Sequence, residues 1–113
     1  NINTSLTLEK MTVNKSAGNL LTVSSGDTIT VTSDLTLTDG LLNGPGVVKV
    51  QGNITQASTM DGGTGVVDFD AAGAQTWTIN GGDGPELRLD SAADASDTLV
   101  MNAAGSIYGL DLT

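Results

Sequence analysis

A glycine turn followed by a short apolar strand recurs through the middle of the chain at nearly constant spacing. Three copies, which lie between Asn43 and Leu89, read NGPGVVKV, GGTGVVDF and GGDGPELRL. Lys49, Asp68 and Arg88 lie at the centres of their strands, and the two intervals between them are almost equal. A repeat of about 20 residues is typical of stacked supersecondary units, which cannot bury their apolar faces singly. The repeat therefore predicts a solenoid.

Short strands with alternating apolar and polar residues continue outside this repeat. The segments TITVT at 28–32, DLTLT at 34–38 and TWTI at 76–79 place apolar residues on one face and threonines on the other. No window has a convincing apolar period of 3.6 residues, and β-branched residues dominate the apolar positions. We expect an all-β chain whose 113 residues, 1–113, form a single domain or a segment of a longer one.

Aligning the strands that follow glycine turns places apolar residues in columns. Two inward-facing columns are predicted: Met11, Ile29, Val48, Val67, Leu87 and Ile107, and beside them Val13, Val31, Val50, Phe69, Leu89 and Gly109. A second set of strands has less regular spacing: Leu35 and Leu37, Ile54 and Gln56, Trp77 and Ile79, Leu99 and Met101. Stacked coils would bring equivalent residues within about 4.8 Å of one another. We therefore predict a parallel β-helix (β-solenoid) with about five coils of 18–21 residues.

Two qualifications belong to this fold prediction. Residues 1–19 fit the register least well, so they are expected to form an irregular or capping coil. The alternative architecture is an antiparallel β-sandwich, which requires hairpin partners rather than columns of residues 19 to 20 positions apart.

The composition limits the chemistry of the chain. The net charge is −9 and the basic residues are Lys10, Lys15, Lys49 and Arg88, so nucleic acid is not an expected partner. The absence of cysteine and histidine excludes disulfides, thiol catalysis and Ser-His or Cys-His arrangements. No apolar run approaches the roughly 20 residues of a membrane span. Because the chain begins at Asn1 without an initiator Met or a leader, we expect a mature product or an excised fragment.

The positions between the two inward columns are predicted to face outward, and three of them are charged. This outward column is Thr12, Thr30, Lys49, Asp68, Arg88 and Tyr108. Asp68 would lie between two cations on neighbouring coils of a solvated face, where each opposite-charge pair contributes about 0.2–1 kcal/mol. We interpret Lys49, Asp68 and Arg88 as a structural ladder that fixes the register of the coils.

Asp70 and Asp90 are predicted to stack as like charges, with Asp68 close by. Such stacking is unfavourable unless a cation bridges the carboxylates or one of them is protonated. Three interpretations are open: a calcium site formed by Asp68, Asp70 and Asp90, paired catalytic carboxylates as in some polysaccharide-degrading β-helices, or carboxylates that splay into water. Calcium is the one cofactor that the sequence suggests.

Trp77 has two interpretations, a surface that stacks on a glycan ring and a core residue of the second strand set, and its position favours the core. Thr-x-Thr triplets at 28–30, 30–32, 36–38 and 76–78 do not recur in one column of this alignment. Strand propensity therefore explains the threonines better than an ice-binding face does.

The string GNITQASTMDGGTGVVDFDAAGAQTWTINGG at 52–82 resembles the β-strand repeats of large bacterial surface and secreted proteins, the filamentous-haemagglutinin and autotransporter-passenger type of right-handed β-helix. The resemblance covers roughly residues 20–113 and rests on rhythm and turn composition. It implies an extracellular stalk, adhesin or fibre segment, and it carries over no catalytic residue.

These observations favour a structural β-solenoid without catalysis, located outside the cell or at the cell surface. We expect a subunit of a surface filament or a segment of an adhesin or stalk. Its partners would be copies associated end to end or further coils of the same chain, because the open strand edges of a solenoid must be capped, extended or paired. The alternative is a carbohydrate-binding or polysaccharide-degrading β-helix module, with glycans as partners.

Overall fold

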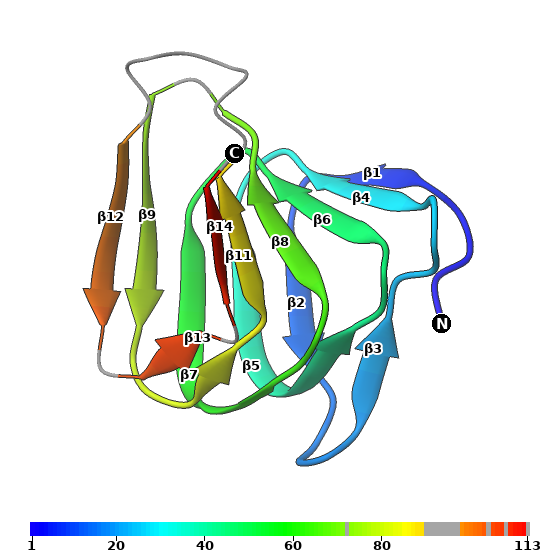
Figure 1. The fold of residues 1–113 in the computed structure, drawn as a ribbon, viewed down its shortest axis with the longest axis horizontal. Helices are drawn as coiled ribbons and strands as arrows, with labels where there is room; N and C mark the ends of the chain where they lie inside the picture. The colour runs from blue at the N-terminus through cyan, green and yellow to red at the C-terminus, as the bar shows by residue number, and fades with distance from the viewer. Residues whose placement is uncertain (72, 90–97, 104, 108, 113) are drawn as a thin grey trace.

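The described part of the chain consists of strands joined by turns. The computed structural model describes residues 1–71, 73–89, 98–103, 105–107 and 109–112, and these contain 14 strands and no helix. The strands form two sheets. The chain passes from one sheet to the other and back, so that successive passes lie side by side (Figure 1).

The first sheet receives one strand from each pass of the chain. In spatial order its six strands are β1 (Leu6–Leu8), β4 (Thr28–Val31), β6 (Val47–Val50), β8 (Val66–Phe69), β11 (Glu86–Leu89) and β14 (Leu110–Leu112). Every neighbouring pair in this sheet is parallel. Because spatial order equals chain order, the first and last coils lie at opposite ends of the stack (Figure 1).

The second sheet is bent and receives two strand segments from each pass. Its strands are β2 (Met11–Asn14), β3 (Leu20–Thr22), β5 (Leu35–Asn43), β7 (Ile54–Gly62), β9 (Ala74–Ile79), β10 (Asp83–Gly84), β12 (Thr98–Ala103) and β13 (Ser106–Ile107). The long strand β5 pairs with β2 at its beginning and with β3 at its end, and β7 pairs in the same way with β9 and β10. Register shifts within the β5–β7 ladder mark the bend.

The predicted parallel β-solenoid is confirmed, and its number of turns is close to the five coils expected. The alternative of an antiparallel β-sandwich is wrong, because every ladder between described strands is parallel. Within residues 1–19, β1 and β2 pair with strands of the next coil, and the register shifts once, between Val13 and Asn14.

The predicted interior columns are correct in the middle of the chain. The first sheet stacks Ile29, Val48, Val67 and Leu87, and beside them Val31, Val50, Phe69 and Leu89. The second sheet stacks Leu35, Ile54 and Trp77, and beside them Leu37, Gln56 and Ile79. The described side chains of these columns are buried and, Gln56 apart, they belong to one hydrophobic core.

At the N-terminal end the predicted columns are wrong. Leu6, rather than Met11, is the partner of Ile29. Met11 lies opposite Leu35, and Val13 also belongs to the second sheet. The chain between Leu6 and Ile29 is longer than the chain between stacked residues of the central coils, so an extrapolation of the central period reaches the wrong strand.

The C-terminal end of the columns is wrong for the same reason. The interval between the stacked first-sheet residues lengthens again in the last coil, and Ile107 lies in β13 of the second sheet. The observed partners of Leu87, Leu89 and Trp77 are Leu110, Leu112 and Met101, in place of the predicted Ile107, Gly109 and Leu99.

At several corners neighbouring coils approach so closely that only glycine fits. Gly63 has a φ of 121°, a region that favours glycine. A Cβ atom at Gly63 would also lie 2.0 Å from the carbonyl oxygen of Leu42 on the preceding coil. The corresponding turn of that coil contains Gly44, with a φ of 104°. The glycine turns of the sequence are therefore corners of the coils.

Candidate functional site

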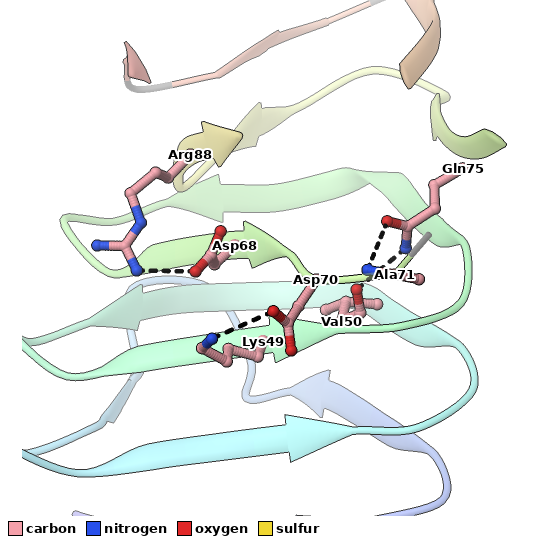
Figure 2. Close-up of polar contacts among 7 residues, drawn as sticks. All are labelled: Lys49, Val50, Asp68, Asp70, Ala71, Gln75 and Arg88. Atoms are coloured by element: carbon pink, nitrogen blue, oxygen red, sulfur yellow. Dashed lines mark hydrogen bonds and ion pairs between the residues drawn. The ribbon is translucent and has the colours of Figure 1, made fainter. Parts of the chain in front are cut away.

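The outer face of the first sheet contains the charged residues that the sequence singles out. Lys49 on β6, Asp68 on β8 and Arg88 on β11 are consecutive partners in the parallel ladder. Because they alternate with the interior column, they lie on the opposite side of the sheet from the core. The structure thus brings the three predicted positions together (Figure 2).

At its ends this outward column differs from the prediction. Thr7 takes the position predicted for Thr12, which lies in the second sheet. Tyr108 lies outside the described residues, and Asp111 of β14 is the partner of Arg88.

Two ion pairs link neighbouring coils on this face. Arg88 Nη2 lies 2.8 Å from Asp68 Oδ2, and Lys49 Nζ lies 3.2 Å from Asp70 Oδ1 (Figure 2). In the ladder Asp68 lies between Lys49 and Arg88. Its side chain pairs with Arg88, whereas the side chain of Lys49 pairs with Asp70. Each of the two carboxylates has its own basic partner.

The two ion pairs differ in burial. The side chain of Asp68 is 0% exposed and that of Arg88 is 30% exposed, whereas Lys49 and Asp70 are 32% and 31% exposed. The sequence-based expectation of a solvated Asp68 is wrong. A buried carboxylate has lost its hydration and depends on its partner for compensation, so Asp68 depends strongly on Arg88.

The carboxylates offer an incomplete set of ligands for calcium. Asp90 lies outside the described residues, and the residues that the structure describes contain no group of three or more His, Cys, Asp or Glu that could hold a metal ion. Calcium takes six to eight oxygen ligands, and Asp68 and Asp70 each have a basic partner. The calcium site at Asp68, Asp70 and Asp90 stays a prediction.

Trp77 is a core residue. Its side chain is 0% exposed, and its ring centroid lies 6.1 Å from that of Phe69. A glycan cannot reach a ring that is completely covered. The interpretation of Trp77 as a glycan-stacking residue is therefore wrong, and the core interpretation is correct.

Two buried glutamines bind main-chain groups of other coils, a role that the sequence analysis missed. Gln75 Nε2 donates a hydrogen bond to the carbonyl oxygen of Val50 (3.0 Å), and Gln75 Oε1 accepts one from the Ala71 N–H (Figure 2). Gln75 Nε2 also donates to the carbonyl oxygen of Gly52, at 2.6 Å. Gln56 Nε2 donates to the carbonyl oxygens of residues 81 and 106, at 3.0 and 3.3 Å. Gln75 alternates with Trp77 and Ile79, and this period of two was the available signal for its inward position.

The threonines form a column that the sequence alignment also missed. Thr12, Thr36, Thr55 and Thr78 are consecutive partners on the outer face of the second sheet. All four are exposed or half-buried. The column contains one threonine per coil rather than a stacked Thr-x-Thr pair, so the triplets do not recur in one column, as the sequence predicts.

No protein family, curated protein or solved structure matches the chain. The described residues contain no helix with the length and apolar character needed to span a membrane. The class of the protein is therefore defined by its fold, a parallel β-solenoid in which two ion pairs link neighbouring coils.

Proposed function

We propose that the protein is a structural β-solenoid without catalysis, located at the cell surface or outside the cell. It acts either as a segment of an adhesin or stalk or as the subunit of a filament. The proposal rests on the unpaired strand edges at the two ends of the stack. Among the described strands, those at the two ends of the stack pair on one side only. They are β1, β2 and β3 at one end and β12, β13 and β14 at the other.

Open edges of this kind favour extension of the stack. An unpaired strand edge exposes a row of N–H and C=O groups that can pair with another strand. Because all described ladders are parallel, both ends offer strands of the same direction, and head-to-tail association gives an open fibre. Further coils of a longer chain would satisfy the same edges in a stalk.

The polar groups of the outer face support a structural role. Asp68 and Asp70 are each paired with a basic side chain of a neighbouring coil. These pairs hold one coil to the next, as a stack requires. The net charge of −9 keeps such a Thr-rich and Gly-rich surface soluble.

The filament version is tested by electron microscopy of the purified chain over a wide range of concentrations. Filaments with a meridional X-ray reflection at about 4.8 Å, the spacing of stacked strands, are expected. Strictly monomeric particles at every concentration would rule out the filament subunit and leave the stalk segment.

The location is tested on intact source cells with antibodies raised against the purified chain. We expect labelling without permeabilisation and loss of the labelled protein after brief treatment of the cells with an external protease. Labelling that requires permeabilisation contradicts the proposed location.

A further inference from the structure

Strands β1 and β14 occupy equivalent positions at the two ends of the first sheet. Both have three residues, with the sequences Leu-Thr-Leu and Leu-Asp-Leu. Leu6 of β1 partners Ile29, and Leu110 of β14 partners Leu87, so both strands continue the same interior column. In sequence and register, β14 is a second version of β1.

The two ends do not match if one intact copy is placed on another. At the N-terminal end, β1, β2 and β3 belong to one coil, whereas at the C-terminal end β14 begins a coil that has no described strand in the second sheet. Stacking β1 of a second copy on β14 would leave β12 and β13 separated from that copy's β2 and β3 by a missing coil. Such a gap is about 4.8 Å wider than strand pairing allows.

We propose that, in a filament of this protein, β14 of one copy takes the place of β1 in the next copy. In this junction β14 pairs with β4 of the next copy, and β12 and β13 pair with its β2 and β3. All three faces then continue without a gap. The inference rests on the filament version of the proposed function and specifies how its subunits join.

The N-terminal segment is suited to displacement because Ile2 and Leu6, which pack against the core, are only half-buried. None of the first ten residues is buried, and Leu8 is 38% exposed although it lies in register with the interior residue Val31. The main-chain hydrogen bonds that β1 makes to β4 would be replaced by those of β14. Leu110 would take the register position of Leu6, so the exchange preserves the ladder.

The charges of the two ends are complementary. Residues 1–23 contain two lysines and one glutamate, whereas the described residues from 86 to 112 contain two acidic residues, Glu86 and Asp111, and one arginine. Opposite charges accelerate encounter and disfavour association of like ends. This distribution favours a second copy, in head-to-tail orientation, as the occupant of the open edges.

The absence of cysteine makes the junction testable by site-specific disulfide formation in the full-length chain. In the proposed junction Asp111 of one copy is the partner of Thr30 of the next, whereas simple stacking pairs Asp111 with Thr7. Partners on adjacent strands are about 4.8 Å apart, within the Cα separation that a disulfide spans. The D111C variant is mixed with T30C in one reaction and with T7C in a matched control, and the joined peptides are identified by mass spectrometry.

We expect the D111C–T30C heterodimer to exceed the D111C–T7C heterodimer at least about tenfold, an effect of about 1.4 kcal/mol in relative population. Independently, filaments of the unmodified chain should have a rise of five coils, about 24 Å, per subunit, rather than the six coils, about 29 Å, of simple stacking. Preferential formation of D111C–T7C, or the longer rise, overturns the strand replacement and leaves the filament intact. An unmodified chain that never assembles overturns both this junction and the filament, and leaves the stalk segment.

Discussion

The central coils and the first coil contain the same kind of strand but differ in burial. Val48 and Val67, on β6 and β8, are 1% and 0% exposed. Leu8, on β1 of the first coil, is 38% exposed although it lies in register with the interior residue Val31. Val13, on β2 of the same coil, is 1% exposed, so the difference lies in the first sheet. There β1 pairs with one strand whereas β6 and β8 each pair with two, and the strand at the end of the sheet is covered less completely.

This difference has a consequence for stability within the molecule. In a solenoid each coil contacts only its neighbours, so stability is approximately a sum of coil and interface contributions. An end coil has one interface instead of two. We therefore expect the first coil to open at a lower free energy than the coils around β6 and β8.

Replacing Trp77 by alanine should have the largest effect on the central region. Removing a completely buried tryptophan costs about 3–5 kcal/mol, and Trp77 is 0% exposed. Urea unfolding followed by circular dichroism measures this loss. The corresponding change in the first coil, Leu8→Ala, removes a side chain in interior register that is 38% exposed and is expected to cost less than about 1 kcal/mol. Similar losses for the two variants would contradict the difference between the regions.

Glycine substitutions compare the two regions through the backbone. Gly63→Ala combines a φ of 121° with a Cβ atom 2.0 Å from a carbonyl oxygen, so we expect a loss of about 2–5 kcal/mol from strain and overpacking together. Gly26, near the first coil, has a φ of 81° but no heavy atom within 4 Å of an added Cβ. Gly26→Ala should therefore cost only the conformational strain, about 1–2 kcal/mol. If Gly26→Ala and Gly63→Ala lower the free energy of unfolding equally, contact between an added Cβ atom and the neighbouring coil does not determine the cost at these corners.

The two ion pairs allow a comparison within the central region. Arg88→Gln leaves the buried carboxylate of Asp68 without its cation, and we expect a loss of about 2–4 kcal/mol at neutral pH. Lys49→Gln breaks a pair in which both side chains are about one-third exposed, and it should cost about 0–1 kcal/mol. Urea unfolding monitored by the fluorescence of Trp77 measures both. If Lys49→Gln proves the more costly, the burial of Asp68 is not what makes its pair important.

The sequence predicted the central stack because every coil there has nearly the same length. Ile29, Val48, Val67 and Leu87 follow one another at nearly equal intervals. At both ends the coil is longer, as the partners of Ile29 in β1 and of Leu87 in β14 show. The repeat length of the central coils does not predict the length of the end coils, because a turn at a solvent-facing corner can become longer without disturbing the core.

The properties of the candidate site were harder to predict than its register. The alternation of strand residues placed Asp68 outward, and outward positions of a sheet are ordinarily solvated. Its burial depends on side chains brought together from different coils. Thr36, Thr55 and Thr78 lie between the aligned residues of the second strand set, whereas Thr12 was assigned to the wrong sheet because of the error in coil length.

Gln75→Ala should have a smaller effect that is again confined to the central coils. Gln75 lies where β8 and β9 are joined by the four residues 70–73, one more than the three residues 51–53 that join β6 and β7 in the preceding coil. Both corners begin with the same backbone hydrogen bond, from the Gln51 N–H to Val31 and from the Asp70 N–H to Val50. At the longer turn the Gln75 amide also donates to the carbonyl oxygens of Val50 and Gly52.

Without the Gln75 amide the carbonyl oxygen of Gly52 loses a donor, at a cost of about 1–3 kcal/mol where it is shielded from water, whereas the carbonyl oxygen of Val50 keeps the Asp70 N–H. Gln51→Ala, on the exposed side of the same corner, is the control and should change the free energy of unfolding by less than about 0.5 kcal/mol. Urea unfolding followed by Trp77 fluorescence measures both. A Gln75→Ala variant as stable as Gln51→Ala would mean that water reaches these carbonyl groups, and that the interior of this solenoid is less completely closed at its corners than along its strands.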